Sequence, residues 1–173
     1  MDLSDFKTGD IILFHTKLKW HNPMSWLSAL IRMFTKCRYN HVGIVVENWG
    51  VPFLNEAIET GIISIPLKDR LNGREMRIIR QITPIVPEKE FAVKANDRLG
   101  RTGYDFSGLL WFQLIYQLTG HWLGHTGEAA KSRMYCAEYV AFMYPEVFER
   151  WWQIAPVDIH NSKEFSTLFE GSI

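Results

Sequence analysis

The sequence predicts an α+β fold in a single domain, residues 1–173, with an antiparallel sheet packed against helices. Short apolar runs bounded by turn residues dominate the chain before Pro87, and patterns of helical period dominate after it. No internal repeat, low-complexity tract or linker divides the chain. Strands and helices that are segregated along one sequence are typical of the α+β class, and 173 residues suit one domain with a substantial core.

The first half of the chain contains five predicted strands. The run IILF follows the turn Thr8-Gly9-Asp10, and HVGIVV and FLNEAI are separated by a turn at residues 48–50, which predicts a hairpin. In MRIIRQI apolar and basic residues alternate, as they do in a half-exposed strand. The expected strands are Ile11–Phe14, His41–Val46, Phe53–Ile58, Ile62–Leu67 and Met76–Ile82.

Four helices are expected. The first begins at Asn22-Pro23, carries an apolar face from Trp26 to Phe34, and ends between residues 36 and 39. The others follow the apolar positions of three later segments, and a polar loop at 124–133 leads into the last, which stops before Pro145. These later helices are expected at Glu88–Leu99, Phe106–Leu118 and from Cys136 to Tyr144.

Composition limits the classes of function. Lysine plus arginine and aspartate plus glutamate each total 19, so the zero formal charge argues against a general nucleic-acid binder. The amino-terminal segment MDLSDFKTGD has no signal-peptide pattern, and two cysteines are too few for a disulfide scaffold, so we expect a cytoplasmic protein. The apolar stretch 108–124 is short and interrupted by polar residues, which fits a buried or membrane-surface helix better than a span.

Cys136 is the main candidate for chemistry. It opens the last predicted helix, where it is either a small core residue or a nucleophile activated by the helix amino terminus. A nucleophilic thiol needs a base, and His41 opens an apolar strand, where a ring that is neither exposed nor used packs poorly. Glu56 lies in the next strand on the face of Leu54 and Ile58, so it could orient His41 across the hairpin.

Alternatives to these three residues remain open in the sequence. Asn55 or Glu59 replaces Glu56 if the strand register differs by one residue. Cys37 is a rival nucleophile, but it lies at a predicted helix end, where the helix dipole disfavours a thiolate. His121 and His125 stand four residues apart, yet glycines interrupt that helix and no further ligand follows at a familiar spacing, so we expect no metal site and no cofactor.

Several segments together resemble the circularly permuted branch of the papain-like NlpC-type amidase and peptidase superfamily, particularly its YiiX-like members. The matching segments are TGDIILF, SALIRMFTKCRYNHVGIVV, NEAIETGI, GYDF, YCAEYVAFMY and APVDIHNSKEF, in the order of that family. The resemblance implies a permuted papain-like fold in which the histidine strand precedes the cysteine helix. It also implies that Cys136 is the nucleophile, His41 the general base and Glu56 the residue that positions His41. Tyr104 and Tyr135, from the matching segments, are the expected substrate-binding residues.

The resulting hypothesis is a cysteine hydrolase that attacks an amide or ester carbonyl and forms a thioester acyl-enzyme. Its expected substrate is a small peptide, a cell-wall peptide or a lipid-linked acyl group, and the aromatic content slightly favours an acyl chain. The alternative is a protein that binds lipid or fatty acid, or transfers an acyl group, in the same cleft. A weak membrane-surface contact through residues 26–34 is a further possibility, although Arg32 and Lys36 form only a thin basic face.

Overall fold

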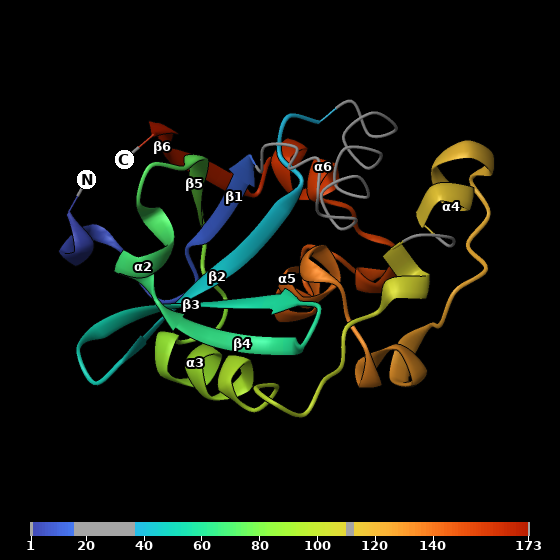
Figure 1. Ribbon diagram of the computed structural model, residues 1–173, viewed down its shortest axis with the longest axis horizontal. Coiled ribbons are helices and arrows are strands. Elements are labelled where there is room, and N and C mark those ends of the chain that lie inside the picture. The colour runs from blue at the N-terminus through green and yellow to red at the C-terminus, as the bar shows by residue number, and fades with distance from the viewer. Residues whose placement is uncertain (1, 16–36, 110–112, 173) are drawn as a thin grey trace.

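The computed structural model describes residues 2–15, 37–109 and 113–172. Within them lies a six-stranded sheet with the order β4-β3-β2-β1-β5-β6, in which every neighbouring pair is antiparallel (Figure 1). The predicted α+β class with an antiparallel sheet is therefore confirmed. The strands are β1 (Ile11–His15), β2 (His41–Asn48), β3 (Val51–Ile58), β4 (Gly61–Pro66), β5 (Glu75–Gln81) and β6 (Phe165–Ser172).

Helices connect and cover the strands. The short α2 joins β4 to β5, and the later helices follow β5 along the chain, as the segregated sequence pattern predicts. The α-helices are α2 (Leu67–Leu71), α3 (Glu88–Asn96), α4 (Gln113–Thr119), α5 (Cys136–Met143) and α6 (Pro156–Asn161). The 3-10 helices are η1 (Leu3–Asp5), η3 (Gly127–Ser132) and η4 (Trp151–Gln153).

The sheet separates two hydrophobic cores. Alternate residues of β1 point to opposite faces, so Ile11 and Leu13 pack in the larger core with α5, while Ile12 and Phe14 pack in the smaller one. The smaller core includes Leu67 of α2, which is fully buried. Helix α5 is buried along its whole length, so the residue at its amino terminus is held rigidly against the sheet.

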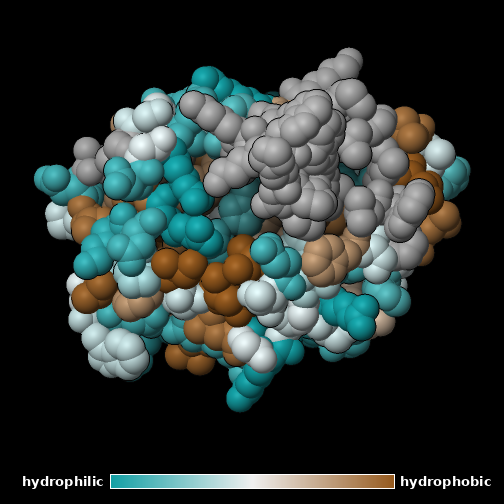
Figure 2. All heavy atoms as spheres, viewed as in Figure 1, coloured by the Kyte–Doolittle hydropathy of each residue, from teal (hydrophilic) through white to brown (hydrophobic). Residues whose placement is uncertain are grey.

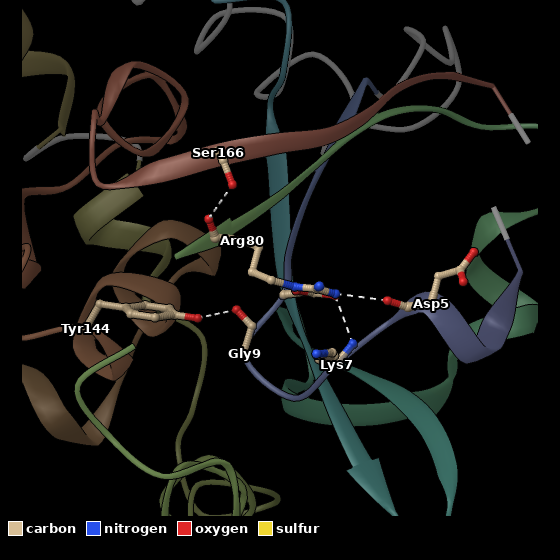
Figure 3. A network of polar contacts seen from close by, with 7 residues as sticks. Asp5, Lys7, Gly9, Arg80, Tyr144 and Ser166 are labelled. Atoms are coloured by element: carbon tan, nitrogen blue, oxygen red, sulfur yellow. Dashed lines mark hydrogen bonds and ion pairs between the residues drawn. The ribbon is translucent and has the colours of Figure 1, made fainter. Parts of the chain in front are cut away.

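The turn before β1 is tied to β5 and to the end of α5 (Figure 3). Arg80 donates two hydrogen bonds to the fully buried Asp10, at 2.6 and 2.8 Å, and one to the carbonyl of Asp5 at 2.9 Å. Tyr144, which follows α5, donates its hydroxyl proton to the carbonyl of Gly9. Gly9 has a φ of 94°, a conformation that other residues rarely adopt. The Thr8-Gly9-Asp10 turn thus fixes the carboxyl end of α5.

Some elements differ from the sequence prediction. Strand β6 and helices α2 and α6 were not predicted, and the segment 124–133 contains η3 instead of being only a loop. The predicted helix after Pro23 lies outside the described residues. The predicted helix 106–118 is helical at 106–109 and again in α4, with residues 110–112 outside the described part.

The surface mixes hydrophilic and apolar side chains on the face drawn in Figure 2. The exposed large apolar residues are dispersed over several elements, from Trp49 in the β2–β3 turn to Leu118 at the end of α4. In the part of the chain that is described, no helix combines the length and the apolar character needed to cross a bilayer.

Candidate active site

Cys136 is the first residue of α5, and its side chain is buried, with 3% of its surface exposed. The backbone N–H groups in the first turn of a helix have no partner within the helix, and their partial charges favour an anion there. Cys136 is a free cysteine, and its position places it beside the backbone N–H groups of the first turn of α5.

Three hydrogen bonds fix where α5 begins. The buried carboxylate of Glu138 accepts a hydrogen bond from the backbone N–H of Tyr135 at 3.0 Å, as a residue in the first turn of a helix commonly does. Upstream, the N–H of Met134 donates to the carbonyl of Gly103 at 2.9 Å, and the N–H of Gly103 donates to the carbonyl of Ser132 at 3.0 Å. The segment that precedes Cys136 is thereby held against residues 102–104.

His41 is the first residue of β2 and lies beside Cys136. Its Nε2 is 2.6 Å from Oε2 of Glu56, and the ring lies close enough to Cys136 for that side chain to raise the pKa of the ring. His41 therefore lies between Cys136 at the start of α5 and Glu56 of β3.

Glu56 is held between two cations. In the β2–β3 ladder it lies opposite Gly43, so its side chain shares a face with His41 two residues earlier. Its carboxylate is 1% exposed and forms an ion pair with Arg70 of α2 through the oxygen that does not contact His41. The residues Cys136, His41, Glu56 and Arg70 therefore form a continuous polar chain from α5 across the sheet to α2.

The electrostatics of this chain favour a charged His41. Burial of the ring opposes protonation, but the hydrogen bond and charge of Cys136, followed by those of Glu56, raise the pKa of His41 from 6.5 to about 10. Burial also opposes ionisation of Glu56, yet His41 and then Arg70 hold the pKa of Glu56 below its ordinary range. At neutral pH the ring is therefore an imidazolium between the sulfur and an ionised carboxylate.

This electrostatic arrangement predicts how His41 titrates. Its ring should stay protonated at pH 8 and lose its proton only near pH 10. Because the folded-state pKa is raised from 6.5, the stability that His41 contributes is complete below about pH 6.5 and is lost as the pH rises through about 10. NMR of ¹³C- and ¹⁵N-labelled imidazole groups measures this directly. A Cys136→Ser variant should move the titration to lower pH, and an unshifted wild-type titration near 6.5 would contradict the geometry.

The two tyrosines expected to bind substrate lie in different environments. Tyr104 is half-buried and lies near Cys136. Burial is the largest cause that raises the pKa of the Tyr104 hydroxyl, and the charge of Cys136 is the next. The ring of Tyr104 contacts that of Phe106, with the centroids 4.8 Å apart. Tyr135 is fully buried, and its hydroxyl lies 2.9 Å from the carbonyl of Ile154 and 3.0 Å from the side chain of Gln113. In this conformation Tyr135 supports the start of α5 from within the core, while Tyr104 lies at the rim of the site.

The rival residues lie elsewhere. Burial raises the pKa of the Cys37 thiol, and the charges that act on it are those of Arg77 and Asp158. Asn55 points to the opposite face from Glu56 and donates to Asn96 of α3 at 3.1 Å, whereas Glu59 is exposed in the turn after β3. The exposed His121 and His125 follow α4 and contribute nothing to the polar chain at Cys136.

Sequence reasoning missed Arg70 and Glu138. Arg70 lies in the five-residue helix α2, and no local pattern links it to a glutamate 14 positions earlier. Glu138 did carry a signal, because a glutamate three positions after a helix cap commonly accepts the N–H of that cap. Burial raises the pKa of Glu138 well above its ordinary value, and the charges of Asp105 and Cys136 add to this shift. The hydrogen bond from the N–H of Tyr135 opposes it.

Comparison with known proteins identifies a fold. Neither the protein-family models nor the curated proteins contain a match to this chain. Among solved structures, the chain is similar to a bacterial protein with a TM-score of 0.66 and 19% sequence identity, over 95% of this chain and 97% of that one. That structure is the metalloprotein yiiX from Escherichia coli O157:H7. The similarity extends over nearly the whole of both chains, so the two share an overall fold.

Proposed function

We propose that this protein is a cysteine hydrolase with a permuted papain-like fold, in which Cys136 attacks the carbonyl carbon of an amide or ester. The observation that carries the proposal is the position of His41, whose ring lies between Cys136, which raises the pKa of the ring, and Glu56, which is 2.6 Å from Nε2. A cysteine, a base and a residue that orients the base are the three parts of a nucleophilic site.

The acylation step begins with an imidazolium and a thiolate. The sulfur attacks the carbonyl carbon, and the developing oxyanion lies near the Cys136 backbone N–H at the start of α5. When the tetrahedral intermediate collapses, His41 gives its proton to the leaving amine or alcohol, and a thioester remains on Cys136. Glu56 keeps the ring oriented and favours its charged form.

The deacylation step reverses the proton flow. Neutral His41 takes a proton from a water molecule, whose oxygen attacks the thioester carbonyl. Collapse of the second intermediate breaks the bond to sulfur, releases the carboxylic acid and restores the imidazolium and thiolate. If an alcohol or amine takes the place of water, the same steps transfer the acyl group, which is the alternative function that the sequence left open.

The neighbourhood of Cys136 suggests the kind of acyl group. Tyr104 and Phe106 form an edge-to-face aromatic pair near the thiol, and 40% of the Phe106 surface is exposed. Aromatic rings at the rim of a site favour an apolar group on the substrate. We therefore place an ester or amide with an apolar acyl chain ahead of a polar peptide.

The solved structure with the similar fold is described as a metalloprotein, and a metal site needs several histidine, cysteine or acidic side chains at one place. Across residues 2–15, 37–109 and 113–172, no three histidine, cysteine or acidic side chains converge as metal ligands. The proposed steps use the side chains of Cys136, His41 and Glu56.

A trapping experiment tests the proposal. Incubation with p-nitrophenyl esters of acetate and of a long-chain fatty acid, followed by acid quenching and peptide mass spectrometry, should find the acyl group on Cys136. Hydroxylamine should remove it, as expected for a thioester. The adduct should be absent in His41→Ala and retained in Cys37→Ala. Acylation spread over lysines and unchanged in Cys136→Ala would show that the thiol is not the nucleophile.

A further inference from the structure

A cluster of cations surrounds Phe142 at the far end of α5. Lys94 Nζ and Arg98 Cζ each lie 4.9 Å from the centroid of the Phe142 ring, and Lys131 Nζ lies 5.8 Å from it. Lys94 and Arg98 come from α3 and the following turn, whereas Lys131 comes from η3. The fold thus brings three positive charges from separate segments to one ring that is 9% exposed.

Attraction to the ring does not account for three cations. An aromatic ring has two negative faces and a positive edge, so three cations cannot each occupy a face of their own. The three positive charges repel one another. Burial is the main cause that lowers the pKa of the Lys94 ammonium group, and the charges of Arg98 and Lys131 lower it further. The charges of Glu146 and Glu90 oppose this shift.

The described residues supply few partners for these charges. Lys131 is paired with Glu128, which is 88% exposed, and Lys94 donates one hydrogen bond to the carbonyl of Phe142 at 3.1 Å. Arg98 forms no side-chain hydrogen bond or ion pair within the described chain, and its Nε is buried without a hydrogen-bond partner. A buried donor of this kind is costly unless something accepts from it.

We propose that Lys94, Arg98 and Lys131 form a binding site for a phosphate group, separate from the site at Cys136. A guanidinium donates two parallel hydrogen bonds to phosphate oxygens, and two ammonium groups complete the neutralisation of its charge. Phe142 lies six residues after Cys136, about 9 Å along the axis at about 1.5 Å per residue. The phosphate therefore binds beside α5, well away from the thiol.

Calorimetric titration of the full chain with inorganic phosphate, at an ionic strength held constant with sodium chloride, tests the site. The wild type should bind phosphate saturably with a stoichiometry of one. Arg98→Gln should weaken binding roughly tenfold or more, because it removes a charge-assisted pair of hydrogen bonds. The matched control is Arg101→Gln, because Arg101 is 74% exposed and already paired with Asp97, and it should bind as the wild type does.

A second variant, Lys131→Gln, removes the partly exposed member of the cluster and guards against a folding defect in Arg98→Gln. Circular dichroism should show that both variants are folded. Vesicles of phosphatidylcholine, with and without phosphatidic acid, separate a lipid head group from free phosphate as the source. Binding to inorganic phosphate alone indicates a soluble ligand, and additional retention by phosphatidic acid indicates a head group. Absence of saturable binding to either, or equal losses in Arg98→Gln and Arg101→Gln, would overturn the site.

Discussion

Replacing His41 with alanine is expected to slow the alkylation of Cys136 by iodoacetamide roughly tenfold at pH 7, because the thiolate is the reacting form and loss of the imidazolium lowers the fraction of thiolate. The ring of His41 is the charged side chain next to the sulfur, and its removal leaves the backbone N–H groups at the start of α5 as the remaining groups that favour an anion there. Peptide mass spectrometry at timed intervals gives the rate at each cysteine separately.

Two controls make that result specific. His121→Ala changes an exposed histidine outside the site and should leave the Cys136 rate unchanged. Cys37, whose pKa is raised by burial, should react slowly in every variant and serves as an internal thiol standard. An equal Cys136 rate in the wild type and His41→Ala would return this cysteine to the role of a core residue and would favour the binding-protein alternative.

Replacing Arg70 with methionine should lower the free energy of unfolding by roughly 3 kcal/mol, because removal of one partner leaves the other charge buried. Glu56 is 1% exposed and Arg70 is 22% exposed, so solvent screens this ion pair only weakly. Urea denaturation followed by tryptophan fluorescence measures the change. Arg70→Lys retains the charge and should recover part of the loss.

The matched control is Arg101→Met. Its ion pair with Asp97 has exposed fractions of 74% and 52%, so water screens it and its loss should cost about 0.5 kcal/mol or less. If Arg70→Met and Arg101→Met unfold at the same urea concentration, the pair between Arg70 and Glu56 contributes little, and Glu56 is supported by His41 alone.

The parts of the fold that sequence predicted are those with a strong local pattern. The strands that begin near Ile11, His41 and Met76 and the helix that begins at Cys136 all agree with the structure, because their apolar periodicity coincides with burial. Strand β6 was missed because most of its residues are exposed or half-exposed and alternate poorly. It is a strand because it pairs with β5 over most of its length, with a bulge at Ile78/Ile79, and that pairing is not local.

The candidate site shows the same division. His41 and Glu56 could be expected to meet, because a hairpin sets their register and places them on one face. Arg70 could not be predicted, since it reaches Glu56 through the packing of α2 on the sheet. The pairing of Cys136 with His41 was a hypothesis from residue chemistry that the family resemblance strengthened, since their proximity depends on how α5 docks on the sheet.

The order of these elements along the chain also bears on how the protein is made. His41 and Glu56 belong to one hairpin and can come together early, whereas Cys136 lies 95 positions after His41 in the sequence and must wait for α5. Contacts with such a large sequence separation form late, after the cost of closing the loop between them has been met. Under the proposed function, the site at Cys136 is therefore assembled only after α5 has been synthesised and has docked on the sheet.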